Sequence, residues 1–306
     1  MKILVTGASA HLARVLLPAL LHHPGVASVT GLDWRPALLR HPRYRHRRRD
    51  LRTADLAAEV AGMDTVIHLA FAVIARDARG RRLSRAARRA VNVEAGARLF
   101  AACAGAGVAR LLCLSSAAVY GPQPDDRCVP ESAPRRPLPG FAYAEDKAAM
   151  EAALDELAGE DGPVVVRLRP HVILGPHCQP LLRRMLAQPF YLAAGRDSPI
   201  QCVHEADVVS ALLAALACRW DATFNIAADE ALPFPAMLRL RHRRAWPLPR
   251  PLAEAGHALL RGLSPAAGER GLLESLCHPL VLCTARAKEE LGWRPRYTTS
   301  DCIRSL

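Results

Sequence analysis

Short apolar runs alternate with apolar stretches of helical spacing along the first 170 residues of the chain. The run KILVT at residues 2–6 predicts a buried strand, TGASA predicts a turn, and apolar positions then recur at helical spacing from His11 to about Leu21. The run VASVTGLD predicts a second strand, which ends at Asp33. The chain is therefore expected to begin with a strand, turn, helix and strand.

The alternation continues beyond a basic loop that follows Asp33. The predicted elements are a helix in DLRTADLAAEVAG, a strand at 65–70, a helix at about 84–106, the strand RLLCLSS, a helix at 142–158 and a strand at 163–170. Strands joined through helices need right-handed crossovers, which produce a mostly parallel sheet covered on both faces. We therefore expect an α/β fold with a doubly wound parallel sheet of the Rossmann type.

The character of the sequence changes after Gly175, where prolines divide the chain into short segments. We expect a Rossmann domain at 1–176, to which a helix and a strand at about 204–228 return, and a small C-terminal substrate-binding lobe at 177–203 and 229–306. Residues 238–263 mix arginines with apolar side chains, which leaves open a basic helix on a membrane surface. A lid is favoured, because three prolines interrupt that pattern within 247–251.

Composition excludes several classes of protein. Apolar residues make up 51% of the chain, yet its longest apolar stretches fall short of the roughly 18 residues of a membrane span. The N-terminus lacks the apolar core of a secretory signal, so a cytoplasmic location is expected. The nine cysteines form no CxxC pair, which predicts reduced, mostly buried thiols, and no metal-ligand spacing occurs, so no metal is expected.

The net charge of +12 raises the question of nucleic-acid binding. Of the 41 basic residues 38 are arginines, because only Lys2, Lys147 and Lys288 are lysines. An excess of arginine over lysine through the whole chain indicates a general coding bias, and no nucleic-acid motif accompanies it. Solvated arginines and attraction of an anionic small molecule are therefore favoured over nucleic acid.

The turn after the first strand resembles a phosphate-binding turn, which places N–H groups at a helix N-terminus. Gly7 is kept, but Ala10 and Ala13 replace the later glycines of GxxGxxG, and the Ala10 methyl group is expected to push against a cofactor. Asp33 stands 26 residues after Gly7, where an acid accepts hydrogen bonds from an adenosine ribose and favours NAD. Arg35 would favour the phosphate of NADP, so NADP remains an alternative; a turn-capping role for Asp33 is the structural alternative.

A second set of residues predicts proton-transfer chemistry. Ser116 follows a strand, and Tyr143 and Lys147 stand four positions apart on a predicted helix, so that they share one face. With three lysines in the chain, this spacing after a tyrosine arises by chance about one time in twenty. We expect the Lys147 ammonium, with a positive nicotinamide ring, to lower the pKa of Tyr143, and Ser116 to hold the substrate oxygen. An exposed helical pair is the alternative without function.

These segments resemble the extended short-chain dehydrogenases/reductases, also called the NAD-dependent epimerase/dehydratase family. The resemblance rests on TGASAHLA, TVIHLA, LSSAAVYG, YAEDK, RPHVILGP and LGWRPRY, which occur in the family's order. It implies a Rossmann fold, bound NAD or NADP, and catalytic Ser116, Tyr143 and Lys147. The cofactor contacts that it implies fall on Gly7, His11, Leu12, Asp33, Asp50, Leu51, Leu69, Ala70, Asn92, Pro170 and the residues after Pro170.

Two positions depart from the members that bind sugar nucleotides. Val172 and Ile200 stand where those members carry an asparagine and an arginine that serve the nucleotide-sugar. With Phe141, Tyr191 and Leu192 expected near the pocket, we predict hydride transfer at a secondary alcohol or ketone. A sugar-nucleotide epimerase or dehydratase with tightly held NAD is the alternative enzyme, and a non-catalytic NAD(P)-binding sensor is the alternative of another class.

Family members dimerise through two helices, which correspond here to about 84–106 and to the helix of Tyr143. The sequence therefore indicates a homodimer, although the arginines of SRAARRAV would repel a symmetric copy.

Overall fold

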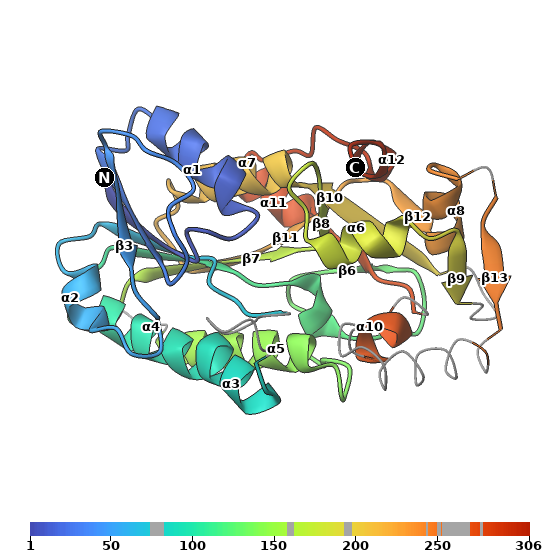
Figure 1. Ribbon diagram of the computed structural model, residues 1–306, viewed down its shortest axis with the longest axis horizontal. Helices are drawn as coiled ribbons and strands as arrows, with labels where there is room; N and C mark the ends of the chain where they lie inside the picture. Colours follow the sequence, from blue (N-terminus) through green and yellow to red (C-terminus); the bar gives the residue numbers. More distant parts are fainter. Residues whose placement is uncertain are drawn as a thin grey trace.

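Seven strands form the central sheet of the computed structural model, which describes residues 1–73, 83–157, 162–192, 198–242, 244–249, 252, 270–275 and 278–306. The strand order is β11-β7-β5-β4-β1-β2-β3 (Figure 1). The strands are β1 (Lys2–Thr6), β2 (Ser28–Asp33), β3 (Tyr44–Arg48), β4 (Thr65–His68), β5 (Arg110–Leu114), β7 (Val164–Pro170) and β11 (Ala222–Ile226). Every neighbouring pair is parallel, which confirms the doubly wound α/β fold.

Helices cover both faces of this sheet (Figure 1). On one face lie α1 (Ala13–His22), α7 (Glu205–Ala215) and α11 (Ala285–Glu290), whose residues Leu16, Leu212 and Ala287 join one core cluster. The other face carries α2 (Leu56–Val60), α3 (Arg85–Arg89), α4 (Ala95–Gly105) and α5 (Ala142–Asp155). Leu99 and Met150 are fully buried in the second cluster. Two apolar layers therefore enclose the strands, as in other parallel sheets.

Strand β3 lies within the basic stretch that the sequence predicted to be a loop, and that prediction is wrong. Its residues, YRHRR, show no apolar alternation, because only Tyr44 is buried. The strand pairs with β2 alone at the edge of the sheet, where exposed arginines are tolerated.

The long helix predicted from Ser84 to Ala106 is present, with one irregularity. Between α3 and α4, residues Ala90–Glu94 form the π-helical turn η1. Such turns are rare and occur mostly at functional positions. The only residue of η1 that is buried is Asn92.

The C-terminal part contains more strands than the sequence predicted. A second sheet has the order β12-β10-β8, and two strand pairs, β13-β9 and β14-β6, accompany it. The bounds are β6 (Cys128–Val129), β8 (Val172–Leu174), β9 (Phe190–Leu192), β10 (Pro199–His204), β12 (Ala231–Pro233), β13 (Trp246–Leu248) and β14 (Val281–Leu282). The helices are η2 (Ala117–Tyr120), α6 (Pro180–Leu186), α8 (Phe234–Arg239), α10 (Arg270–Ser275) and α12 (Thr299–Arg304). Apart from the six-residue β10, these strands have two or three residues, which is too short to show a period of two.

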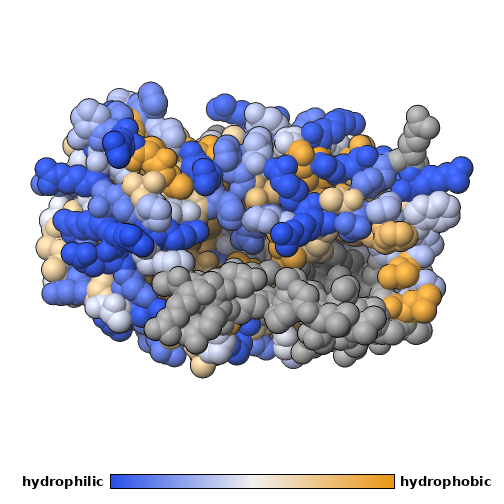
Figure 2. Space-filling view, in the orientation of Figure 1, coloured by the Kyte–Doolittle hydropathy of each residue, from blue (hydrophilic) through white to orange (hydrophobic). Residues whose placement is uncertain are grey.

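A separate core supports this part of the molecule. Leu174, Ile200 and Met237 belong to one buried cluster that α12 completes with Ile303. At the outer end, apolar side chains gather where β9 and β13 carry the half-exposed Phe190 and Trp246 (Figure 2). The division into domains stays a prediction, and most of the expected lid at 238–263 lies outside the described residues.

The prediction that all cysteines are reduced is wrong for one pair. Cys128 and Cys283 form a disulfide across 155 residues, with a Cα–Cα distance of 4.9 Å. The parallel pairing of β6 with β14 brings them together, and no sequence spacing reveals that contact. Six other cysteines are free and buried, as expected, whereas Cys277 lies outside the described residues. Within the described part of the chain, no helix has the length and apolar character needed to cross a bilayer.

Candidate active site

The carboxyl ends of the parallel strands bring the predicted site residues to one edge of the sheet. Gly7 follows β1, Asp33 ends β2, Leu69 follows β4, Ser116 lies two residues after β5, and Pro170 ends β7. Ligands of open α/β sheets bind at this edge. The alternation of strands and helices thus gathers residues that are far apart in the sequence.

Ser116, Tyr143 and Lys147 meet between β5 and α5. The Ser116 side chain caps η2 by accepting a hydrogen bond from the Ala118 N–H at 3.2 Å. A hydrogen bond links Ser116 to Tyr143. The Lys147 ammonium donates to the Leu114 carbonyl at 2.5 Å and lies 3.9 Å from the centre of the Phe71 ring. The i and i+4 spacing therefore places both α5 side chains against the end of β5.

Burial controls the proton affinity of these groups. It lowers the pKa of Lys147 to about 8, although neighbouring Cys113 and Glu151 oppose the shift. Burial raises the pKa of Tyr143 above its usual value, and the hydrogen bond with Ser116 opposes that rise. In the chain by itself desolvation of the phenolate dominates, so the lowering of the Tyr143 pKa by Lys147 and a nicotinamide ring stays a prediction for the site with cofactor.

Aromatic rings enclose the Tyr143 side chain. Phe71 meets it edge-on at a centroid distance of 5.4 Å, and Phe141 lies 5.6 Å away. Gly271 of α10 packs against Phe141 so closely that an added Cβ atom would lie 2.4 Å from the Phe141 Cβ. The surroundings of the Tyr143 ring are thus largely apolar, and α10 packs behind Phe141.

Asn92 ties the π-helical turn to the catalytic helix. Its amide donates to the Asp146 carboxylate at 2.9 Å and to the Ala72 carbonyl at 3.2 Å, and its oxygen accepts from the Ala72 N–H at 2.6 Å. Arg85 lies 2.7 Å from the same Asp146 carboxylate and 3.4 Å from Glu145. Arg85 is therefore partly neutralised within the chain, which reduces the repulsion expected at a dimer contact; the dimer itself stays a prediction.

The turn after β1 keeps part of a phosphate site. Gly7 has φ +70° and approaches β4 so closely that a Cβ atom would lie 2.6 Å from the Ala70 nitrogen. The Ala10 N–H donates to the Gly7 carbonyl at 2.8 Å, so the turn itself uses that donor. The N–H groups of His11 and Leu12 have no hydrogen-bond partner in the described part of the chain. Two backbone donors therefore stay available where a pyrophosphate would bind.

Asp33 is engaged by its own neighbours. Its carboxylate accepts hydrogen bonds from the Ser9 N–H at 3.0 Å, the Arg35 N–H at 2.9 Å, and the Arg35 guanidinium at 3.1 and 3.0 Å. These contacts use the four acceptor positions of a carboxylate. Arg35 must therefore move before Asp33 can accept hydrogen bonds from a ribose.

The remaining predicted cofactor residues surround the same edge. Arg52 holds the Asp50 carboxylate at 2.6 Å, and this hydrogen bond lowers the pKa of Asp50. Leu51, Leu69 and Pro170 are buried, whereas Ala70 is partly exposed. The cofactor contact expected of Asp50 would compete with Arg52, just as the ribose competes with Arg35 at Asp33.

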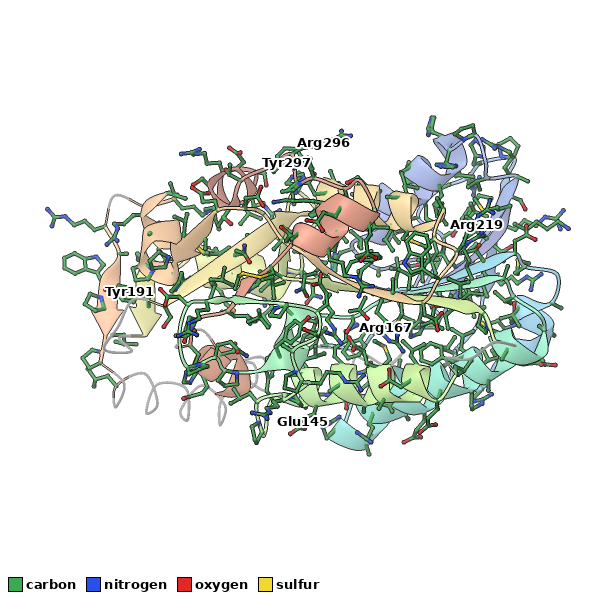
Figure 3. All side chains as sticks on the ribbon, turned by 180° about the vertical axis from the view of Figure 1, so that it is seen from behind. Glu145, Arg167, Tyr191, Arg219, Arg296 and Tyr297 are labelled. Carbon is green, nitrogen blue, oxygen red and sulfur yellow. A yellow bond between two sulfur atoms is a disulfide. The ribbon has the colours of Figure 1, made fainter. Side chains whose placement is uncertain are left out.

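Val172 and Ile200 lie in the apolar core of the C-terminal part. Ile200 is 4% exposed, and Val172 packs against the same cluster from β8. Tyr191 also packs on this cluster, and Figure 3 places it at the outer end, far along the molecule from Glu145 of α5. Nothing at these three positions can neutralise a diphosphate.

Glu151, which follows Lys147 by one helical turn, is not among the residues predicted from the sequence. Its carboxylate is fully buried and accepts hydrogen bonds from Ser115 and, at 2.9 and 2.6 Å, from Arg169. The spacing of four residues from Lys147 was the available signal. Phe71 carried no comparable signal, because its contact with Lys147 depends on the position of β4 relative to α5.

A doubly wound sheet with this edge defines a dinucleotide-binding enzyme of the short-chain dehydrogenase/reductase type. A sequence profile described as the NAD dependent epimerase/dehydratase family matches residues 3–227. The chain belongs to that family, which confirms the family and the enzyme class expected from its motifs.

The chain is also similar in sequence to uncharacterised proteins and in fold to solved structures. An uncharacterised protein of Mycobacterium tuberculosis is 32% identical over 98% of this chain and 82% of its own length. Another from Sinorhizobium fredii is 27% identical over 64% of this chain and 52% of its own. MoeE5 in complex with UDP-glucuronic acid and NAD has a TM-score of 0.78 at 24% identity, covering 100% of this chain and 97% of that one. UDP-glucose 4-epimerase of Thermus thermophilus, with NAD, has a TM-score of 0.77 at 22% identity, with coverages of 99% and 97%.

Proposed function

We propose that the chain is an NAD(P)-dependent oxidoreductase that transfers hydride at the carbon of a secondary alcohol or ketone. The observation that supports this proposal most is the meeting of Ser116, Tyr143 and Lys147 beside an apolar wall formed by Phe71 and Phe141. The His11 and Leu12 N–H groups would hold the pyrophosphate, and Asp33 the ribose once Arg35 has moved. The bound nicotinamide ring supplies the hydride donor or acceptor.

Each catalytic side chain has a separate role in this proposal. Tyr143 gives its proton to the carbonyl oxygen during reduction and takes it back from the hydroxyl during oxidation. Ser116 donates a hydrogen bond to the same oxygen as negative charge develops there. Lys147 is mostly protonated at pH 7, since its pKa is about 8, and its charge stabilises the phenolate left by Tyr143.

The raised pKa of Tyr143 affects the pH dependence of the rate in each direction. Without ligand the phenol is protonated at neutral pH, which is the form that reduction requires. We therefore expect the rate of ketone reduction to be sustained at pH 7 and above, and the rate of alcohol oxidation, which needs the phenolate, to increase as the pH rises.

A sugar-nucleotide epimerase or dehydratase is the second candidate. Solved structures similar to this chain include complexes with UDP-glucose or UDP-glucuronic acid and NAD, and they cover the C-terminal part as well. The buried Ile200 and the apolar Val172 favour the first candidate, because neither can bind a diphosphate. A non-catalytic NAD(P) sensor is the third, and the catalytic set speaks against it.

The test compares Tyr143→Phe with Tyr297→Phe, which removes the hydroxyl of an exposed tyrosine. NAD and NADP, oxidised and reduced, are screened by thermal shift, and NAD(P)H consumption is followed with a panel of ketones. The Tyr143 variant should lose about 10²- to 10⁴-fold in rate and keep the thermal shift, while the Tyr297 variant should keep both. Cofactor that co-purifies and never exchanges would support the epimerase instead, and a chain that no dinucleotide stabilises would end the proposal.

A further inference from the structure

The face of the sheet beneath α5 becomes polar at its last two strands. On β7, Val165 packs in the α5-side core, and Arg167 and Arg169 follow at alternate positions on the same face. Thr223 of β11 is the ladder neighbour of Arg167. Guanidinium groups therefore occupy positions where a parallel sheet normally presents apolar side chains.

A pocket of about 450 Å³ opens at this place. Its lining includes Ala133, Arg135, Asp155, Arg167, Arg169 and Thr223. Asp155 ends α5, whereas Tyr143 lies in the first turn of that helix, roughly 18 Å away along its axis. The pocket is thus separate from the candidate active site.

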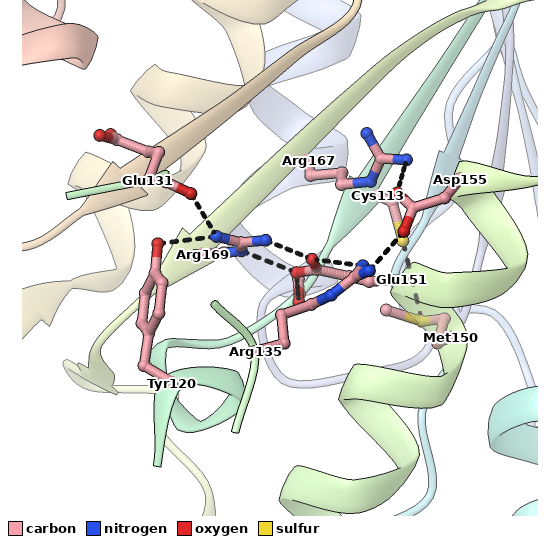
Figure 4. Close-up of polar contacts among 10 residues, drawn as sticks. Cys113, Tyr120, Glu131, Arg135, Met150, Glu151, Asp155, Arg167 and Arg169 are labelled. Carbon is pink, nitrogen blue, oxygen red and sulfur yellow. Dashed lines mark hydrogen bonds and ion pairs between the residues drawn. The ribbon is translucent and has the colours of Figure 1, made fainter. Parts of the chain in front are cut away.

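The Arg169 guanidinium is already used by the fold. It donates to both Glu151 oxygens, to the Tyr120 hydroxyl at 2.8 Å and to the Glu131 carbonyl at 3.0 Å (Figure 4). The Glu151 carboxylate in turn accepts hydrogen bonds from Arg169 and Ser115. This pair is structural and leaves little capacity for a ligand.

Arg167 is in the opposite situation. Its side chain is 9% exposed, yet one hydrogen bond, from Nη2 to Asp155 at 2.8 Å, is its only contact of this kind in the described part of the chain. Its Nε atom is buried without a partner there. A buried donor left unpaired costs about 1–3 kcal/mol, so the fold satisfies the Arg167 guanidinium much less fully than that of Arg169.

Charge at the pocket favours an anion. Arg135 shares the single Asp155 carboxylate with Arg167 and reaches Glu151 only at 3.4 Å. Once the Arg169–Glu151 pair is set aside, two guanidinium groups face one carboxylate that is 47% exposed. The pocket therefore has one positive charge in excess and several free donors.

We propose that this pocket is a second ligand site, which binds a small phosphate-bearing anion. Arg167 and Arg135 would hold the phosphate oxygens through charge-assisted hydrogen bonds, and the Thr223 hydroxyl would donate a further one. The volume of about 450 Å³ is large enough for a phosphate ester such as a sugar phosphate. Asp155 would exchange part of its contact with the two arginines for solvent, which its exposure permits.

The test titrates inorganic phosphate and pyrophosphate against the whole protein, using ³¹P NMR and thermal shift at a constant ionic strength set with sodium chloride. Wild-type protein should show saturable binding, and Arg167→Gln should weaken it at least tenfold. Arg219→Gln is the matched control, because Arg219 is an exposed arginine that lies away from Arg167 (Figure 3). It should bind as the wild type does.

A further variant separates this pocket from the phosphate turn. Ala10→Asp places a carboxylate in the turn after β1, so it should weaken any binding of pyrophosphate at that turn and leave unchanged the binding that Arg167→Gln weakens. Arg135→Gln serves as a second pocket variant in case Arg167→Gln fails to fold. Unchanged binding in a folded pocket variant, or loss of binding in Ala10→Asp alone, would overturn the proposal without touching the proposed function.

Discussion

The Arg35 guanidinium binds both carboxylate oxygens of Asp33, at 3.1 and 3.0 Å. Asp33 is the acid expected to receive the adenosine ribose, and Arg35 is the residue expected to favour a 2′-phosphate. In the structure the two side chains bind each other, so the choice between NAD and NADP depends on which of them is released for the cofactor.

We predict that Arg35→Gln changes the cofactor preference. Without Arg35, Asp33 is free for the ribose hydroxyls and repels a 2′-phosphate, so NAD should bind a few-fold tighter and NADP about tenfold weaker, in line with the loss of one charge-assisted hydrogen bond. Calorimetric titration of both cofactors measures this, with Arg45→Gln, an exposed arginine of β3, as the control. Equal changes for NAD and NADP would contradict the prediction.

Lys147 should leave a signature in the pH dependence of stability. Its pKa in the folded chain is about 8, below its value of about 10.4 in an unfolded chain. Between these values the unfolded state binds more protons at this group, so the contribution of Lys147 to the free energy of unfolding rises with pH by up to about 3 kcal/mol. The buried thiols of Cys103, Cys113 and Cys302, whose pKa is raised to about 12, lower the stability of both proteins at high pH. Urea unfolding at pH 7 and pH 10 should therefore show the Lys147 contribution as a change in the stability difference between the wild type and Lys147→Met. Parallel curves for the two proteins would refute the assignment.

Gly7 and Gly62 allow steric contact to be separated from backbone conformation. Both have positive φ, +70° and +69°, but an added Cβ atom meets Ala70 at Gly7 and nothing within 4 Å at Gly62. The left-handed conformation should cost both alanine variants about 1–2 kcal/mol in the free energy of unfolding. Overpacking should cost Gly7→Ala roughly a further 1–3 kcal/mol. Chemical denaturation measures the difference, and equal losses would show that the approach to β4 relaxes easily.

The disulfide should contribute to stability through its long loop. Cys128→Ser opens a link between residues 155 positions apart, and the expected loss is about 2–5 kcal/mol. A reducing agent should lower the melting temperature of the wild type to about that of the Cys128→Ser variant, and it should leave the melting temperature of the variant unchanged. A wild-type protein indifferent to the reductant would show that the link carries no stability.

Prediction from sequence succeeded where one period is repeated over several residues. Strands such as β1 and β7 and the helix α5 have clear apolar patterns, and Tyr143 and Lys147 needed only helical geometry to be placed together. Sequence prediction failed at β3, because its arginines give it no apolar alternation. It also failed at β8 and β12, which have three residues each. In these segments pairing with a neighbour, and not local pattern, decides the conformation.

The sequence by itself determined the parallel α/β fold, the family, and the spacing of Ser116, Tyr143 and Lys147, because each depends on short-range periodicity or on motif order. Only the tertiary structure decided that burial raises the pKa of Tyr143, that Arg35 binds Asp33, that Cys128 meets Cys283, and that a buried Arg167 donor has no partner among the described residues. Each of these depends on which side chains share a low-dielectric space, and that is settled by packing between segments distant in the chain.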